Sequence, residues 1–542
     1  MNKLFKTIAL VGAFIAGIAT ADACTNFIVT RGASTDGSNM VTYAADSHGL
    51  YGSLYSYVPG KYNPFMDVTE WDTGRFIGRI PQVETRYRTL GNSNEHSLFI
   101  TETTFGGRPE LEDPNGGIDY GSLIYITLQR AKTAREAIDI IVDLANTHGY
   151  CSSGESFSLI DQNEAWIMEL IGKGPEDKGI VWVARRIPDG YVSAHANQAR
   201  ITTFPWNDPE NCLYAADVAD VARKFGWFEG KNEDFSFAEA YAPLDFGAMR
   251  GCEARVWAFF RTVADDMDQY EDYAMGHNPA NRMPLWVMPR EKVSPKVLMD
   301  CMRDHYEGTK MDMTNDIGAG GEGCPYRWRP MYFEVDGVEY CNERATATQQ
   351  TGFWLMGQAR PEKVGILWFG TDDAATSPLT PIYVNSLEVP ESLREGNGSM
   401  LEYSDTAMFW VTNRVAQFAY LRYNIVGKHV REQVDAWENA MIETVNAMDK
   451  TLAEISNQKK ARKVATNFTV TTAQTLFEKW VELDKYLMVK YIDGNVKGEE
   501  NGKFIDNGNG KDIPGKIEQP GYTENWKRAV AADKGEILKV VK

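Results

Sequence analysis

The chain changes character at Cys24. Before this residue, two lysines precede an uncharged apolar run, Ile8 to Ile18, and Ala21-Asp22-Ala23 has the small-x-small pattern of a signal cleavage site. The apolar run is shorter than the about 20 residues that cross a bilayer. We therefore expect residues 1–23 to be a removed signal peptide. The mature protein would be exported, to a periplasm or to the outside of the cell, and would begin at Cys24.

Two other interpretations of this segment stay open. One is a retained N-terminal anchor, and the other is a lipid attached to Cys24, as in bacterial lipoproteins. The second fits poorly, because lipoprotein sites usually have Leu three positions before the cysteine and a small residue just before it, whereas Ala21 and Asp22 stand upstream here. No later apolar stretch is long enough to span a membrane, so we expect no membrane contact after signal removal.

A chain that begins with cysteine carries a thiol and a free α-amine on one residue. A thiol needs a base to become a good nucleophile, and an α-amine has a pKa near 8, so that it can accept a proton around neutral pH. Nucleophile and base would then come from a single amino acid. The junction at Cys24 therefore favours an amidohydrolase that uses an N-terminal cysteine.

Composition narrows the remaining choices. The chain has 542 residues and a net charge of -19, which argues against nucleic acid or anionic membrane as partners. Apart from Cys24 there are six cysteines, an even number that permits disulfides in an exported protein. None of them has a CxxC or histidine-cluster spacing, so we expect no metal site and no cofactor.

The residues after Cys24 predict a β-hairpin. Thr25 to Thr30 and Ser38 to Ala44 have the composition of strands, and a turn-rich segment separates them. Hairpin geometry returns the end of the second strand to the start of the first, which would bring Asp46 close to Cys24. Asp46 is therefore a candidate partner of the Cys24 amine or thiol, although Asp also commonly stabilises turns.

The order of the remaining elements favours an α+β fold. A strand at Leu98 to Thr104 is followed by two helices, the second starting with a capping box at Thr133 and Glu136, and then by several strands up to Ala196. This is not a regular βαβ alternation, so it suits two mainly antiparallel sheets packed together with helices outside. From about residue 406 the periodicity is helical, and the tail from Asp493 is predicted to be loop-like.

Three polar residues stand out along this order. Glu102 lies inside an apolar strand, Asn197 follows a strand end and could donate to a developing oxyanion, and Arg255 on a helix could orient catalytic groups. Each also has an ordinary interpretation: a solvated strand glutamate, a turn asparagine and a surface ion pair.

Taken together, these stretches resemble peptidase family C69, bacterial dipeptidases of the N-terminal nucleophile class. The resemblance extends to about residue 430. It rests on the order of the following motifs: Cys24-Thr25-Asn26-Phe27, Ala33-Ser34-Thr35-Asp36-Gly37-Ser38, Ala45-Asp46-Ser47, Asn94-Glu95-His96, Ile100-Thr101-Glu102-Thr103, Asp161-Gln162-Asn163-Glu164-Ala165-Trp166, Val192-Ser193-Ala194-His195-Ala196-Asn197-Gln198 and Arg255-Val256-Trp257.

The resemblance implies an αββα sandwich and the hydrolysis of dipeptides. It divides the chain into a signal peptide (1–23), a catalytic domain (24–430) and a helical C-terminal region with a loop-like tail (431–542). More distant relatives, the penicillin acylases and bile salt hydrolases, share a Cys, Asp, Asn and Arg pattern that carries over onto Cys24, Asp46, Asn197 and Arg255. One departure is that members commonly have an arginine shortly before the Asp46 position, where this chain has Tyr43.

The resulting hypothesis is acyl transfer through a thioester on Cys24. Asn197 would donate to the oxyanion, Asp46 would hold the N-terminal amine, and Arg255 would fix that network. A dipeptidase must also recognise a free α-amine, and Glu102 is the candidate carboxylate for it. The alternatives are an amide acylase that prefers N-acylated substrates and a lipid-anchored binding protein. Small peptides are the expected partners, and homo-oligomer formation stays open.

Overall fold

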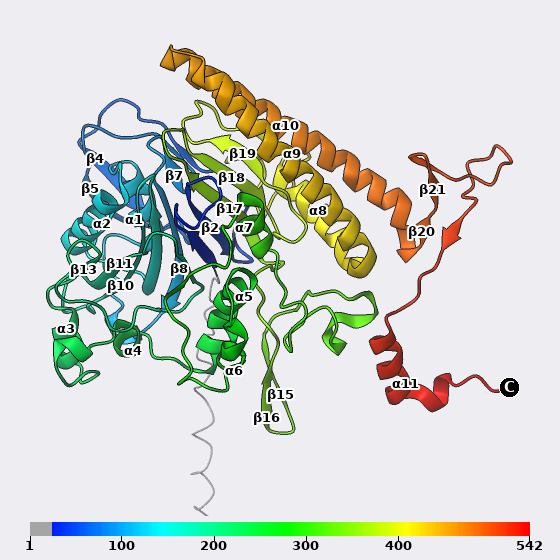
Figure 1. Ribbon diagram of the computed structural model, residues 1–542, viewed down its shortest axis with the longest axis horizontal. Helices are drawn as coiled ribbons and strands as arrows, with labels where there is room; N and C mark the ends of the chain where they lie inside the picture. Colours follow the sequence, from blue (N-terminus) through cyan, green and yellow to red (C-terminus); the bar gives the residue numbers. More distant parts are fainter. Residues whose placement is uncertain (1–23) are drawn as a thin grey trace, which may run out of the picture.

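Two antiparallel sheets form the centre of the molecule in the computed structural model, which describes residues 24–542 (Figure 1). The predicted signal peptide, residues 1–23, lies outside the described residues. The first sheet has the strand order β14-β12-β1-β2-β17-β18-β19. Its strands are β1 (Asn26–Val29), β2 (Asn39–Asp46), β12 (Val192–His195), β14 (Trp286–Val287), β17 (Thr351–Ala359), β18 (Ile366–Thr371) and β19 (Thr380–Tyr383).

The second sheet has the order β13-β11-β10-β9-β8-β7-β6-β3. Strands β9, β10 and β11 pair as consecutive antiparallel hairpins, whereas two helices lie in the chain between the paired strands β8 and β9. Its strands are β3 (Ser56–Tyr57), β6 (Thr89–Leu90), β7 (Ser93–Asn94), β8 (Phe99–Gly106), β9 (Gly154–Ile160), β10 (Ala165–Gly172), β11 (Ile180–Arg186) and β13 (Cys212–Tyr214).

The buried apolar residues form one core between the two sheets and one core on the outer face of each sheet. Neighbouring residues of β1 belong to different cores: Ile28 belongs to the core that both sheets share, and Phe27 packs with helix α5 (Ala254–Val263) on the outer face, where its ring stacks on Phe259 at 4.3 Å. On β8, Phe99 faces the shared core and Ile100 faces helices α1 (Tyr120–Leu128) and α2 (Ala134–His148). The layers are therefore helix, sheet, sheet and helix, and the α+β prediction is confirmed.

Helices cover both outer faces. Helix α2 begins as its sequence predicts, since the Thr133 side chain accepts the backbone N–H of Glu136, and it ends at Gly149, whose φ is 84°. The helices up to residue 301 are α1 (Tyr120–Leu128), α2 (Ala134–His148), α3 (Val218–Lys224), α4 (Phe237–Tyr241), α5 (Ala254–Val263), α6 (Glu271–Ala274) and α7 (Pro295–Cys301).

Small two-stranded hairpins lie apart from the two large sheets. Those before residue 350 are formed by β4 (Phe65–Thr69) with β5 (Phe76–Pro81) and by β15 (Tyr332–Val335) with β16 (Val338–Cys341). Those near the C-terminus are formed by β20 (Val496–Lys497) with β23 (Ile517–Glu518) and by β21 (Glu499–Glu500) with β22 (Lys503–Phe504).

The C-terminal part is helical. Helix α8 (Met408–Leu421) contacts β18, and the long helices α9 (Lys428–Ala453) and α10 (Gln458–Tyr491) run side by side along the first sheet (Figure 1). The loop-like prediction for the tail needs a correction, because the tail contains helix α11 (Glu524–Leu538), which Thr523 caps. Its glycine- and asparagine-rich start obscured a later run of helix formers. No helix in residues 24–542 has the length and apolar character of a membrane span.

Candidate active site

Cys24 lies at the start of β1, at one end of the first sheet. The next residue, Thr25, exchanges backbone hydrogen bonds with Ala44 on β2, and this register places Asp46 beside Cys24, as the hairpin predicts. The backbone N–H of Asp46 donates to the sulfur. The thiol is 3% exposed, and burial, followed by the charges of Glu102 and Asp46, raises its pKa well above the usual value. The resting thiol is therefore protonated and needs a base.

Glu102 reaches the sulfur from the second sheet. Its Oε1 lies 3.4 Å from Cys24 Sγ and accepts a hydrogen bond of 2.6 Å from the Tyr43 hydroxyl, which itself lies 3.8 Å from the sulfur. Burial raises the pKa of Glu102 to about 7. Tyr43, which stands near the usual arginine position, therefore contributes a hydroxyl where an arginine would contribute a cation.

Arg255 ties the nucleophile to the predicted oxyanion residue. From helix α5 its Nη1 donates to the carbonyl of Cys24 at 2.6 Å and to the Thr25 hydroxyl at 2.8 Å. Its Nη2 donates to the carbonyl of Ala196 at 3.0 Å and to Asn197 Oδ1 at 2.9 Å. The guanidinium is buried, so these acceptors replace its hydration. Arg255 is a positioning residue rather than a surface ion pair.

Asn197 has the left-handed backbone conformation, with φ of 64°. Asparagine tolerates this conformation better than most residues. Its Nδ2 donates one hydrogen bond, of 2.7 Å, to the carbonyl of Thr104, and a side-chain amide carries a second N–H. The arrangement fixes the amide between β12 and β8, close to Cys24.

The side chain of Asp46 is held by residues far away in the sequence. Arg344 Nη2 donates to its Oδ2 at 2.5 Å and Thr351 Oγ1 donates to its Oδ1 at 2.6 Å. Burial raises the pKa of Asp46 while Arg344 opposes the rise. The described contact between Asp46 and Cys24 is made by the backbone, so a role of its carboxylate in holding the α-amine stays a prediction.

His195 precedes this site in sequence but is not positioned to act as a base. Its ring nitrogens contact the hydroxyls of Thr103 at 2.7 Å and Ser158 at 2.6 Å. These two contacts join the first sheet to the second. Burial, followed by the charge of Arg200, lowers its pKa to about 3. The ring therefore stays neutral and structural.

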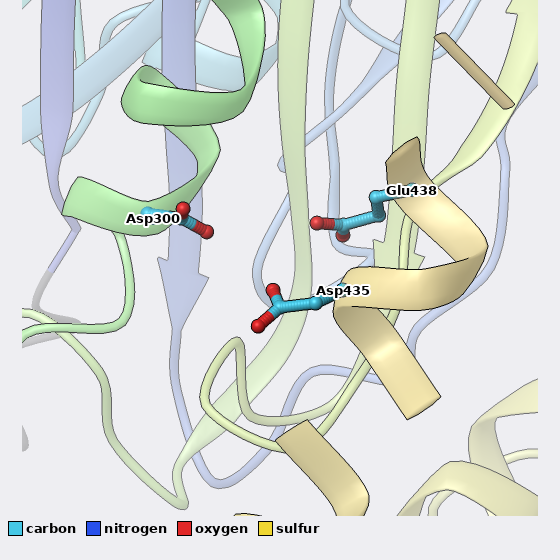
Figure 2. Close-up of side chains that lie close together, drawn as sticks. All are labelled: Asp300, Asp435 and Glu438. Atoms are coloured by element: carbon cyan, nitrogen blue, oxygen red, sulfur yellow. The ribbon is translucent and has the colours of Figure 1, made fainter. Parts of the chain in front are cut away.

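A second group of carboxylates lies at the junction of α7 and α9. Figure 2 shows Asp300 on one helix facing Asp435 and Glu438 on the other, a spacing that could suit a metal ion. Lys296 Nζ, however, lies 2.5, 2.6 and 3.3 Å from oxygens of these three residues, and Arg303 and Arg431 pair with them as well. These side chains form an ion-pair network that joins the C-terminal helices to the core.

The fold thus brings together all five residues proposed from sequence: Cys24, Asp46, Glu102, Asn197 and Arg255. Sequence reasoning missed Arg344, which binds Asp46, and Glu155, which contacts Glu102. Arg344 lies in an irregular segment almost 300 residues from Asp46, and no local pattern marks it. Glu155 is a charged residue in an apolar strand, the same signal that drew attention to Glu102.

Comparison with known proteins bears on this arrangement. Residues 55–436, more than half of the chain, match peptidase family C69. The chain belongs to peptidase family C69. The family assignment confirms the resemblance found in the sequence and makes the protein a peptidase.

The relatives of this C69 member have consistent names. A probable dipeptidase of Salmonella dublin is 25% identical over 315 residues, which cover 55% of this chain and 69% of that protein. The probable dipeptidase B of Streptococcus pyogenes serotype M1 is 21% identical over 88% of this chain and 94% of its own length. A probable dipeptidase of Latilactobacillus sakei is 22% identical over 69% and 76%. These names support the prediction of a dipeptidase.

Proposed function

We propose that this protein is a bacterial exported dipeptidase that acts through the N-terminal thiol of mature Cys24. The observation that carries the proposal is the position of the sulfur, which lies at a sheet end beside Glu102 with Arg255 on its carbonyl. The names of the relatives support the substrate class. The two-layered sheets with helices on both outer faces support a sandwich of the N-terminal nucleophile type.

The reaction follows from the protonation states. The pKa of the thiol is raised, so a base must take its proton when substrate binds. The α-amine of mature Cys24 takes that proton, and the thiolate sulfur forms a bond to the scissile carbonyl carbon. The carbonyl π electrons move to oxygen, which accepts a hydrogen bond from the Asn197 side-chain amide.

The second half of the reaction restores the enzyme. The C–N bond breaks, the ammonium of Cys24 returns the proton to the leaving amine, and a thioester remains. Water, deprotonated by the same amine, then attacks the thioester and releases the N-terminal amino acid and the thiol. Arg255 acts by holding the Cys24 carbonyl and Asn197 in one geometry.

The test begins with the mature terminus. Intact mass and N-terminal sequencing of the exported protein should show a free, unmodified Cys24. The full-length wild type should hydrolyse dipeptides, Cys24→Ala should be folded and inactive, and Cys24→Ser should keep at most a trace of activity, because a hydroxyl is the poorer nucleophile.

Two results would reject the proposal. Full activity of Cys24→Ala would remove the mechanism, and an acylated Cys24 would favour the lipoprotein. Cys212→Ala is the matched control, since Cys212 is also a buried free cysteine but belongs to β13, and it should keep wild-type kcat.

A further inference from the structure

Two buried glutamates lie side by side next to the nucleophile. Thr104 on β8 is directly opposite Glu155 on β9, so Glu102, two residues before Thr104, is a diagonal neighbour of Glu155 on the same pair of strands. Both carboxyls are almost completely buried, at 1% and 0% exposure. They are hydrogen-bonded to each other, and Thr104 Oγ1 donates to Glu155 Oε1 at 2.6 Å.

The chain itself supplies little to balance this pair. Within residues 24–542 no lysine, arginine or histidine forms an ion pair with either carboxyl, and apart from the contact between the two glutamates their Oε2 atoms have no hydrogen-bond partner. The titratable groups that face the pair are Cys24, Tyr43, Tyr120, Tyr125, Tyr150 and Asp72, which carry no positive charge. Two buried carboxyls in contact therefore need a shared proton or an external cation.

The two carboxyl groups differ in pKa and therefore in their protonation state at neutral pH. Burial raises the pKa of Glu102 to about 7, while hydrogen bonds from Tyr43 and Glu155 restrain the rise. Burial and the neighbouring Glu102 raise the pKa of Glu155 well above its usual range. At neutral pH Glu155 is thus the protonated partner and donates to Glu102, which is the group that ionises.

We propose that Glu102 and Glu155 form one binding pair for the α-ammonium group of the substrate, in which Glu102 carries the charge and protonated Glu155 holds it in position. The proposal rests on the proposed dipeptidase function. In a dipeptide the α-amine is two bonds from the scissile carbonyl carbon. A carbonyl placed at Cys24 Sγ therefore brings the amine toward Glu102 Oε1, which is 3.4 Å from that sulfur.

The chemistry of the pair selects a free amine. An ammonium group makes charge-assisted hydrogen bonds to Glu102, and the buried setting strengthens them. An N-acylated substrate brings no charge and leaves the carboxylate unpaired. Exposed Asp72, whose Oδ1 accepts a hydrogen bond of 2.8 Å from Tyr120, adds negative charge near the pair and favours approach of a cation.

The pH dependence has a defined sign. Only ionised Glu102 binds the ammonium, and the ionised fraction falls as pH drops below about 7. KM for a dipeptide should therefore rise as pH falls below this value, approaching tenfold per unit, and should rise again above about pH 8, where the α-amine of the dipeptide loses its proton. Below pH 7, binding should release a proton from Glu102 to the solvent.

The experiment measures kcat and KM for the hydrolysis of alanyl-alanine and of N-acetyl-alanyl-alanine from pH 5.5 to 9. Glu102→Gln should raise KM for the free dipeptide by about tenfold or more, the effect of one charge-assisted hydrogen bond, and remove its preference over the acetylated form. Glu155→Gln, whose amide can still donate to Glu102, should keep KM at pH 7.5 within about threefold of wild type and shift the pH at which KM begins to rise. Glu155→Ala should lose the preference. Glu110→Gln, an exposed change beyond the end of β8, is the control.

Calorimetry on the inactive Cys24→Ala protein gives a measurement that is independent of turnover. Titration with alanyl-alanine in two buffers of different ionisation enthalpy should show release of close to one proton at pH 6 and uptake of protons at pH 8.5, where the α-amine of the free dipeptide is mostly deprotonated. Absence of release at pH 6 would overturn the proposal. So would a Glu155→Gln enzyme that loses dipeptide preference as completely as Glu102→Gln, because Glu155 would then carry the charge itself.

A third result that would contradict the proposal concerns the Cys24 amine. If the pair served that amine instead, the variants would change kcat for free and acetylated substrates equally. Failure of the dipeptidase proposal is recognised separately, by wild-type enzyme that does not hydrolyse dipeptides.

Discussion

Asn197 shows that one residue in this site must satisfy both structural and chemical requirements. Asn197 needs a left-handed backbone, an acceptor for Arg255 and a donor to Thr104, and asparagine meets all three. A turn asparagine would need only the first of these. The network therefore favours the oxyanion role over the ordinary interpretation.

Removing the Asn197 side chain should slow the chemical step. Asn197→Ala is expected to lower kcat by about 10²-fold or more with little change in KM, since an oxyanion donor acts mainly in the transition state. Asn197→Gly, which accepts the left-handed conformation without strain, should show the same loss and so separates chemistry from backbone strain. Steady-state kinetics on dipeptides measure both.

Asn163→Ala is the matched control for this pair. Asn163 is an exposed asparagine in the turn between β9 and β10, and its removal should leave kcat unchanged. Wild-type kcat in both Asn197 variants would rule out a donor role for that side chain.

Elements are joined in this protein by buried charges as well as by apolar packing. Helix α9 carries Glu438, which is fully buried and pairs with Arg303 and Lys296. Its neighbour Trp437 donates a hydrogen bond of 2.9 Å to the carbonyl of Leu379 before β19. The helix thus completes the charge balance of the core.

Glu438→Ala should strongly destabilise the fold. The substitution removes the fully buried carboxylate partner of the Arg303 guanidinium and leaves only the partly exposed Asp300, and breaking a buried pair in this way costs about 3–5 kcal/mol. Urea unfolding should show a lower free energy of unfolding by this amount. Glu443→Ala removes an exposed glutamate one to two turns along the same helix and should change the free energy of unfolding by less than about 0.5 kcal/mol. Equal effects of the two substitutions would contradict the structural role of the network.

The C-terminal segments contribute unequally to the stability of the fold. Helices α9 and α10 bury Val430, Leu476 and Trp480, and Asp449 pairs with buried Arg360 at 2.5 Å. The tail after α10 is mostly exposed, and helix α11 has no buried residue. The division proposed from sequence, with a boundary near residue 430, is therefore best examined by truncation.

Two shortened chains should behave differently. A protein ending at Ile492 should fold, keep dipeptide hydrolysis and melt within a few degrees of wild type. A protein ending at Val426 should not fold, because it exposes the apolar surface under α9 and α10 and removes the buried carboxylates that pair with Arg303 and Arg360. Circular dichroism melting and expression in soluble form measure this. A folded, active chain ending at Val426 would show that residues 24–426 are an independent domain.

The amino-acid sequence alone determined the local elements and singled out Cys24 as the proposed nucleophile. Alternating apolar residues, turn formers and the Thr133 cap indicated the hairpin after Cys24 and helix α2, because these signals act over a few residues. The order of short motifs indicated the C69 family, which the family match confirms. The hairpin also placed Asp46 next to Cys24, since its geometry follows from turn position.

Tertiary structure decided what each charged side chain touches. Arg344 reaches Asp46 across 298 residues, and Glu155 lies against Glu102 only because β8 and β9 pair in one register. Whether a carboxylate is ionised depends on the dielectric and the partners around it, and burial by both sheets raises the pKa of Glu102 to about 7. A linear pattern shows that a glutamate lies in an apolar strand, but the second glutamate and the missing cation become visible only once the sheets are packed.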